Sequence, residues 1–130
     1  MRFLITITIA VVTLVGFMAC GDDSSTNVTP PPGSDHRKVV EMRDNNFSPK
    51  DLVVAVGDTV DWVNVGANTH TTTSGAGCAA DGIWNSGSLG SGGTFRAIFD
   101  ASHITQTGTL PYFCIPHCAM GMTGTITVNP

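Results

Sequence analysis

Basic residues are scarce in this chain, and charged residues of either sign are few. Six Lys and Arg stand against ten Asp and Glu, which gives a formal net charge of −4, and charged residues make up only 12% of the 130 residues. The chain therefore lacks the basic patch that nucleic-acid binding requires. Low charge together with 42% hydrophobic residues also excludes a largely disordered chain. Its four histidines are too few for a multicopper or multizinc enzyme.

Sustained helical periodicity is also missing, except in one apolar run at the N-terminus. Arg2 is followed by an uncharged stretch over residues 3–18, then by Ala19 and Cys20. A basic start, an apolar middle and a small residue at the exit are typical of a secretory signal over residues 1–19. The cysteine resembles the lipobox of bacterial lipoproteins, which implies lipidation of Cys20 and a membrane anchor. An uncleaved membrane-spanning segment is the alternative, and both place the remaining chain outside the cytoplasm.

Two segments follow this leader. Residues 20–38 are rich in Ser, Thr, Asp and Pro, with three consecutive prolines, and are expected to form a linker in which His36 is solvated. Residues 39–130 are expected to form one all-β domain, because short runs of Val, Ile, Thr and Phe alternate with turn residues.

Several short strands at this spacing predict an antiparallel Greek-key sandwich. The weakest part of this prediction is the stretch from 64 to 93, which consists mostly of small and polar residues. It is too long for an inert loop, and long loops on a rigid sandwich often carry sites. The strands are expected at residues 39–43, 52–56, 59–64, 94–99, 110–114 and 123–128.

The most informative segment lies near the C-terminus, where Cys114, His117 and Met122 follow one another closely. A thiolate, an imidazole and a thioether on one loop form a ligand set suited to copper. Met120, two residues before Met122, is a rival thioether. The alternative is that Cys114 is a plain buried thiol and Met122 a core methionine, without a metal.

A second imidazole must come from elsewhere in the chain. His70 is expected to supply it from the segment after the third expected strand, whereas His103, the competitor, lies in a polar segment without apolar shelter. Two His, one Cys and a distant axial Met are the ligands of a blue-copper electron-transfer site. A dinuclear centre like that of cytochrome oxidase, with Cys114 and Cys118 as its cysteines, needs a histidine where this chain has Met122, and is excluded.

Several short motifs extend the pattern beyond the candidate ligands. They are Cys114-Ile115-Pro116-His117, Gly121-Met122, Trp62-Val63-Asn64 followed by His70, Asn46-Phe47-Ser48-Pro49, Gly57-Asp58-Thr59-Val60 and DGIWNSG at 81–87. Through them, residues 39–130 resemble a plastocyanin-type cupredoxin. The resemblance implies a cupredoxin-like Greek-key β-sandwich of about seven or eight short strands. It also implies one type 1 copper ion, with His70, Cys114, His117 and Met122 as ligands.

One residue departs from the plastocyanin pattern. Thr71 stands where plastocyanins often have an Asn that hydrogen-bonds to the cysteine loop. Because a hydroxyl can do part of that job, altered tuning of the site is expected rather than its loss.

The resemblance also accounts for the four cysteines. Lipid would take Cys20 and copper would take Cys114, which leaves Cys78 and Cys118 as an even pair in an oxidising compartment. A disulfide that touches the position next to His117 resembles the one in plant phytocyanins, and it implies a Cys78–Cys118 bond. Two free thiols are the alternative.

The leading hypothesis is a type 1 blue-copper electron carrier that cycles Cu(II)/Cu(I) between extracytoplasmic redox partners. No set of acid, base and nucleophile indicates an enzyme. In related proteins the electron leaves through the C-terminal His, which implies a docking face around His117 for redox protein donors and acceptors. A monomer is expected, anchored through Cys20 at a membrane in the periplasm or at the cell surface. The alternatives are a copper-binding or copper-delivery protein without redox shuttling, and an adhesion module in which the metal is incidental.

Overall fold

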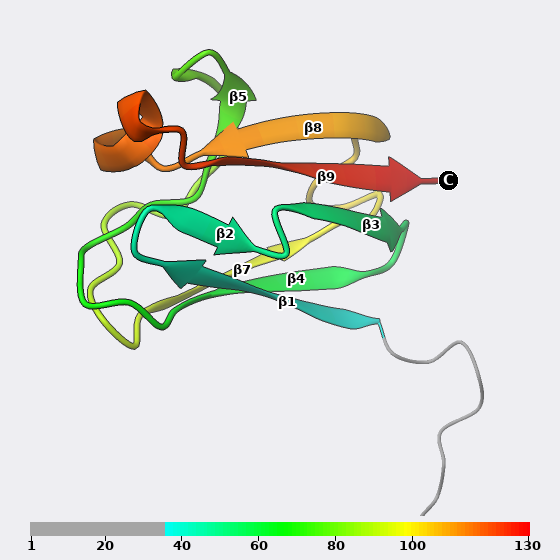
Figure 1. Cartoon of the computed structure of the whole chain (residues 1–130). Coiled ribbons are helices and arrows are strands. Elements are labelled where there is room, and N and C mark those ends of the chain that lie inside the picture. Colours follow the sequence, from blue (N-terminus) through cyan, green and yellow to red (C-terminus); the bar gives the residue numbers. More distant parts are fainter. Residues whose placement is uncertain (1–35) are drawn as a thin grey trace, which may run out of the picture.

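The computed structural model describes residues 36–130 (Figure 1). The expected signal segment over residues 1–19, the candidate lipidation site Cys20 and the linker up to residue 35 lie outside the described residues. Within residues 36–130, no helix is both long and apolar enough to cross a bilayer. The first strand begins at Arg37, two residues before its expected start, and its backbone is paired from there onward.

Two β-sheets pack face to face, which confirms the expected all-β sandwich (Figure 1). The first sheet has the strand order β2-β1-β4-β7, and the second has the order β3-β9-β8-β5-β6. The described residues form nine strands and one short 3-10 helix, η1. Their bounds are β1 Arg37–Arg43, β2 Asn46–Ser48, β3 Asp51–Ala55, β4 Thr59–Asn64, β5 Thr73–Ala76, β6 Ala79–Asn85, β7 Thr94–Ile98, β8 Gly108–Phe113, η1 Ile115–Met120 and β9 Thr123–Asn129.

Two strand pairs depart from the expected antiparallel arrangement. β1 pairs with β4 in parallel and β3 pairs with β9 in parallel, whereas the other pairs are antiparallel. The cause is a change of sheet: after β2 the chain enters the second sheet as β3, and then returns to the first sheet as β4 in the direction of β1 (Figure 1). Alternation of apolar and polar residues marks a strand but not its direction.

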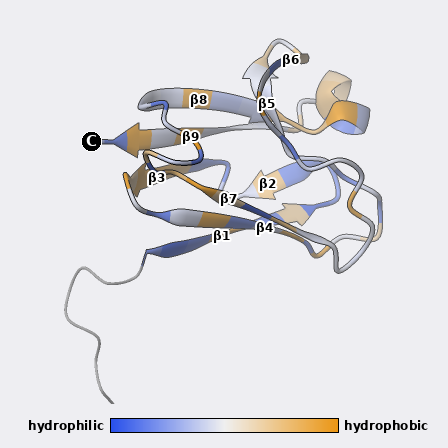
Figure 2. Cartoon of the chain, turned by 180° about the vertical axis from the view of Figure 1, so that it is seen from behind, coloured by the Kyte–Doolittle hydropathy of each residue, from blue (hydrophilic) through white to orange (hydrophobic). Residues whose placement is uncertain are grey.

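The core lies between the two sheets, and apolar stretches occur in the strands of both (Figure 2). At its centre, the fully buried ring of Trp62 in β4 lies 5.7 Å from the ring of Tyr112 in β8 and 5.8 Å from that of Trp84 in β6. Each such aromatic pair adds about 0.5–1.5 kcal/mol beyond the area it buries. These contacts join the two sheets into a rigid support for the loops at their ends.

The loops of the sandwich gather at two opposite ends (Figure 1). One end holds the β1–β2 turn, the long segment after β4 and the connection from β8 through η1 to β9. The other end holds the β3–β4 turn, the β7–β8 connection and both ends of the described chain. The candidate ligand residues His70, Cys114 and His117 all belong to the first end.

The stretch from 64 to 93 contains two strands, β5 and β6, that its composition did not reveal. Ser74 is fully buried in β5, although a small polar residue predicts a loop. Asp81 and the carbonyl of Trp84 share its single O–H as acceptors, and its oxygen accepts the backbone N–H of Trp84 at 2.9 Å. A buried polar strand is stable here because its hydroxyl group is fully hydrogen-bonded.

His36, which was expected to be solvated, has a partner in the structure. Its Nδ1 lies 3.0 Å from Oδ1 of Asp58, and its carbonyl accepts the backbone N–H of Thr59. The side chain is 63% exposed, as expected for a solvated histidine. Its contact with Asp58 was not expected.

The contribution of Asp61 in β4 to the stability of the fold is expected to depend on pH. Its carboxylate is 6% exposed and accepts hydrogen bonds from Arg37 and Arg96, the latter at 2.6 Å from Nε. The hydrogen bonds from Arg96, and then those from Arg37, lower the pKa of Asp61 in the folded state despite burial. The carboxylate therefore stabilises the fold above the unfolded-state pKa of about 3.9, and this contribution is lost as the pH falls below it.

We expect Asp61→Asn to lower the free energy of unfolding of the metal-free protein by about 2 kcal/mol at pH 7. The difference from the unchanged protein should shrink at pH 3, as denaturant unfolding at both pH values would show. Glu41→Gln removes an exposed ion pair between Glu41 and Arg43, both in β1, and should change stability by less than about 1 kcal/mol. A deficit for Asp61→Asn that is equal at both pH values would contradict this account.

Candidate metal centre

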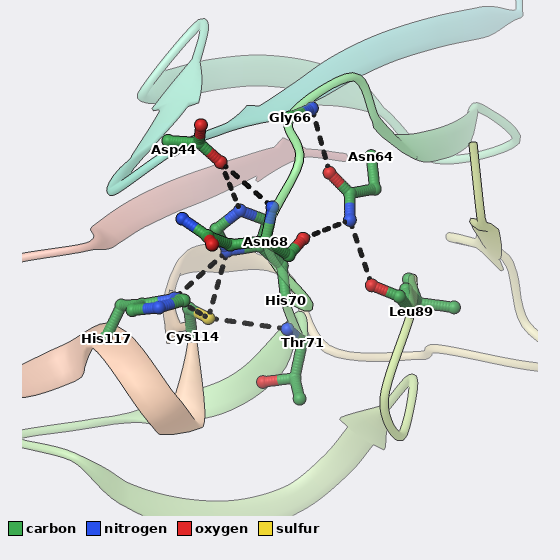
Figure 3. A network of polar contacts seen from close by, with 9 residues as sticks. All are labelled: Asp44, Asn64, Gly66, Asn68, His70, Thr71, Leu89, Cys114 and His117. Atoms are coloured by element: carbon green, nitrogen blue, oxygen red, sulfur yellow. Dashed lines mark hydrogen bonds and ion pairs between the residues drawn. The ribbon is translucent and has the colours of Figure 1, made fainter. Parts of the chain in front are cut away.

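Three side chains that lie far apart in the sequence converge at one end of the sandwich (Figure 3). Nδ1 of His70 lies 3.6 Å from Sγ of Cys114 and 3.1 Å from Nδ1 of His117, and the latter atom lies 3.4 Å from the sulfur. His70 and Cys114 are fully buried, whereas His117 is half-buried. Three potential ligand atoms therefore lie close together, and His117 is the member of the cluster that is partly exposed to solvent.

His70 is held by the segment that follows β4. Its backbone N–H donates to the carbonyl of Leu89 at 3.0 Å, and its carbonyl accepts the N–H of Leu89 at 2.8 Å. The buried side chain of Asn64 donates to the carbonyls of Asn68 and Leu89, and accepts the N–H of Gly66 (Figure 3). Asn64 therefore ties the two sides of this segment together, and the imidazole of His70 has a fixed position.

Cys114 and His117 are held by a closed turn between β8 and β9. The N–H of His117 donates to the carbonyl of Cys114 at 3.1 Å, and the N–H of Cys114 donates to the carbonyl of Met122 at 3.0 Å. The six-residue helix η1 has Pro116 in its first turn, and Gly121 caps its end with φ 86°, a left-handed conformation that favours glycine. So short a helix has no periodicity that the sequence could reveal.

The sulfur of Cys114 receives a backbone hydrogen bond from the N–H of Thr71, at 3.4 Å. The Thr71 hydroxyl also accepts the N–H of Ile115, at 2.8 Å. The bridge to the cysteine loop that was expected from this hydroxyl is therefore present. The N–H of Thr71 therefore points at the sulfur atom, which binds a metal as a thiolate.

The other candidate ligands, Met122, Met120 and His103, differ in burial and in position. Met122 is fully buried, and its N–H donates to the carbonyl of His117 at 3.2 Å, whereas Met120 is 60% exposed. This difference favours Met122 as the axial donor, a role that stays a prediction. His103 belongs to the opposite end of the sandwich, where its Nδ1 lies 2.9 Å from Asp100, and it is not part of the cluster.

Asp44 belongs to the site and was missed by the sequence analysis. It lies in the β1–β2 turn, with Oδ1 3.6 Å from Nε2 of His70 (Figure 3). The N–H of Asn68 donates to the same oxygen, at 3.2 Å, and lowers the pKa of Asp44. Burial lowers the pKa of His70, which keeps its imidazole neutral and able to act as a ligand. No spacing rule links residues 44 and 70, so the sequence carried no signal for this contact.

The implied disulfide is present in the structure. Cys78, at the tip of the β5–β6 hairpin, is bonded to Cys118 in η1 across a sequence separation of 40 residues. Cys114 is the free cysteine of the described chain, and it is buried. The bond fixes η1 to the second sheet at the residue next to His117.

The donor atoms fit a single metal ion. Ligand atoms at about 2.0–2.3 Å from one ion lie roughly 3.5 Å apart when three of them surround it, and the separations here are 3.1 to 3.6 Å. Two imidazoles and a thiolate are borderline and soft ligands, which suit copper. Within residues 36–130, His70, Cys114 and His117 form the one group of three or more His, Cys, Asp or Glu side chains close enough together to hold a metal ion.

Comparisons with known proteins agree with this geometry. Residues 35–129 match the model of the copper binding proteins of the plastocyanin/azurin family. A plastocyanin from Scenedesmus fuscus is 34% identical over 89 residues, which cover 64% of this chain and 86% of that protein.

Solved structures show the same fold. A purple cupredoxin from Nitrosopumilus maritimus superposes with a TM-score of 0.61 at 24% identity, over 70% of this chain and 98% of that one. The Cu(I) form of an amicyanin variant gives 0.59 at 28% identity, over 74% and 85%. The chain therefore belongs to the plastocyanin/azurin family of copper-binding proteins, its fold is that of a cupredoxin, and its cofactor is copper.

Proposed function

We propose that this protein is a type 1 blue-copper electron carrier, with His70, Cys114, His117 and Met122 as the copper ligands. The observation that carries the proposal is the convergence of three ligand atoms within a buried and hydrogen-bonded frame. Membership of a family of electron carriers supports it. Bound copper would supply a one-electron couple between Cu(II) and Cu(I).

The residues around the site would let one electron move with little rearrangement. Thiolate and thioether donors favour Cu(I), and imidazoles suit Cu(II). The frame around His70 and the closed turn around Cys114 hold these donors in one arrangement, because their backbone groups are paired with fixed neighbours. Burial of His70 and Cys114 keeps water away from the metal position.

We place the route of electron entry and exit at His117, the half-buried member of the cluster. Ile115, Ala119 and Met120 on the same helix are exposed and apolar or small, and we name these three residues the docking face. Residues 101–130 contain no Asp, Glu, Lys or Arg. An uncharged face of this kind suits brief contacts with redox protein donors and acceptors.

Electron self-exchange between the Cu(I) and Cu(II) forms tests this function, and NMR line broadening measures its rate. We expect fast exchange and no loss of copper to a chelator over repeated cycles of reduction and oxidation. Slow exchange with ready transfer of copper to the chelator would instead identify a copper-delivery protein.

The docking face predicts the effect of one added charge. Ala119→Glu should slow self-exchange about tenfold at low salt, because two like charges would meet in the encounter complex, while the visible spectrum stays unchanged. Ala101→Glu makes the same substitution at the opposite end of the sandwich, where the residue is also exposed, and should have little effect. Equal rates for Ala119→Glu and the unchanged protein would place the electron route elsewhere.

The proposed location is outside the cytoplasm, on a membrane. Plastocyanin-type proteins are extracytoplasmic, and a disulfide next to the copper loop is consistent with an oxidising compartment. We propose that Cys20 carries the lipid anchor, and that the segment from Cys20 to the start of β1 forms a linker with a reach of about 23 Å. The proposal includes a monomeric protein that meets its redox partners near that membrane.

A further inference from the structure

One ligand histidine has a polar atom without a hydrogen-bond partner. Nε2 of His70 is fully buried and makes no hydrogen bond in the described structure. The nearby acceptor is Oδ1 of Asp44, at 3.6 Å, which is beyond hydrogen-bond distance but within range of an ion pair. A buried N–H needs a partner, and Figure 3 shows the carboxylate of Asp44 directed toward this side of the imidazole ring.

Three features of the chain bring Asp44 to this position. It lies in the turn between β1 and β2, where Asn45 has φ 66°, a left-handed conformation that Asn adopts more readily than most residues. The N–H of Asn68, two residues before His70, donates to Oδ1 of Asp44. A Cβ atom at Gly66 would lie 2.5 Å from the same oxygen, so the absent side chain of Gly66 leaves room for the carboxylate.

We propose that Asp44 is a positioning residue for His70 and that its negative charge lowers the reduction potential of the copper. This inference rests on the proposed function. A metal-bound histidine commonly directs its second ring N–H to a carboxylate, which fixes the ring orientation.

The direction of the effect follows from charge. With the Cys114 thiolate, a Cu(II) site has a net charge of +1, and a Cu(I) site has none. A carboxylate on the far side of His70 stabilises the positive state more than the neutral one. Because Asp44 is 48% exposed, salt should weaken its influence.

The experiment compares Asp44→Asn with the unchanged protein. The amide oxygen can still accept the N–H of Asn68, so the variant removes the charge while keeping this backbone contact. We expect the Cu(II)/Cu(I) equilibrium to shift roughly tenfold toward Cu(I), which equals a rise of about 59 mV for a one-electron couple. The rise should be smaller at 1 M salt, and the visible band should persist.

Two further variants separate charge from structure. Gly66→Ala keeps the charge of Asp44 but displaces its carboxylate from His70, and should also raise the reduction potential of the copper. Asp100→Asn also removes a carboxylate beside a histidine, His103, but at the opposite end of the sandwich, and should leave the potential unchanged. A potential that does not move in Asp44→Asn, or that moves equally in Asp100→Asn, would overturn the electrostatic part of the proposal.

A readout that does not depend on copper chemistry tests the positioning part. In the zinc-loaded protein, proton NMR can follow exchange of the His70 Nε2–H with water. Exchange should be faster in Asp44→Ala than in the unchanged protein, and Asp44→Glu should restore part of the protection. Equal exchange in the unchanged protein and Asp44→Ala would overturn the contact. Because Zn²⁺ is redox-inactive, this measurement tests the contact even if the protein is not an electron carrier.

Discussion

Replacing Cys114 with Ser is expected to abolish the intense visible absorption of the copper-loaded protein and its electron self-exchange. The thiolate supplies the sulfur-to-copper charge transfer and the soft donor that stabilises Cu(I). Loss of an outer partner of a metal ligand costs roughly 10–100-fold in affinity or activity, and loss of this ligand should cost more. Absorption spectroscopy and NMR line broadening of the variant check both expectations.

The structure offers matched controls for this variant. Serine is close in size to cysteine, so the metal-free variant should still fold, and thermal unfolding would show it. Met120→Leu changes an exposed thioether on the same loop, and should leave the band in place. An intense band that survives in Cys114→Ser would show that another residue binds the copper.

Removing the Cys78–Cys118 disulfide is expected to have the largest effect on stability. The bond closes a loop with a sequence separation of 40 residues, and loop-closure entropy then predicts a loss of about 4 kcal/mol. It is also the covalent link between the β5–β6 hairpin and η1, which carries His117. The double variant Cys78→Ser/Cys118→Ser should therefore unfold at lower denaturant concentration, and its copper should leave more easily.

A reductant provides the control for this prediction. The unchanged metal-free protein and the double variant should have similar unfolding midpoints once the disulfide is reduced, and different midpoints before reduction. Denaturant unfolding with and without the reductant measures both. Identical midpoints without reductant would mean that the bond contributes nothing to the stability of this domain.

The sequence predicted the parts of this protein that depend on local pattern. The strand at Thr59–Asn64 has its expected bounds because apolar residues alternate there between clear turn signals. The cysteine loop was recognisable because its donors lie close together in the chain. The structure brings His70 into the cluster and leaves His103 outside it, which supports the preference for His70, and its role as a ligand stays a prediction.

The sequence could not show features that arise from tertiary contacts. β5 was hidden because its stability depends on the hydrogen bonds of Ser74, and these come from β6. The parallel pairing of β1 with β4 follows from the path of the chain between sheets. The contact of Asp44 with His70 exists only because the β1–β2 turn and the segment after β4 meet at one end of the sandwich.

A visible absorption spectrum of the purified protein with one equivalent of Cu(II), followed by ascorbate, shows whether the copper is bound as a type 1 site. We expect an intense blue or green band that bleaches on reduction and returns on oxidation. A bound copper ion with only a faint spectrum, without the thiolate band, would contradict the type 1 site formed by His70, Cys114 and His117, and would leave a copper-binding cupredoxin that does not carry electrons.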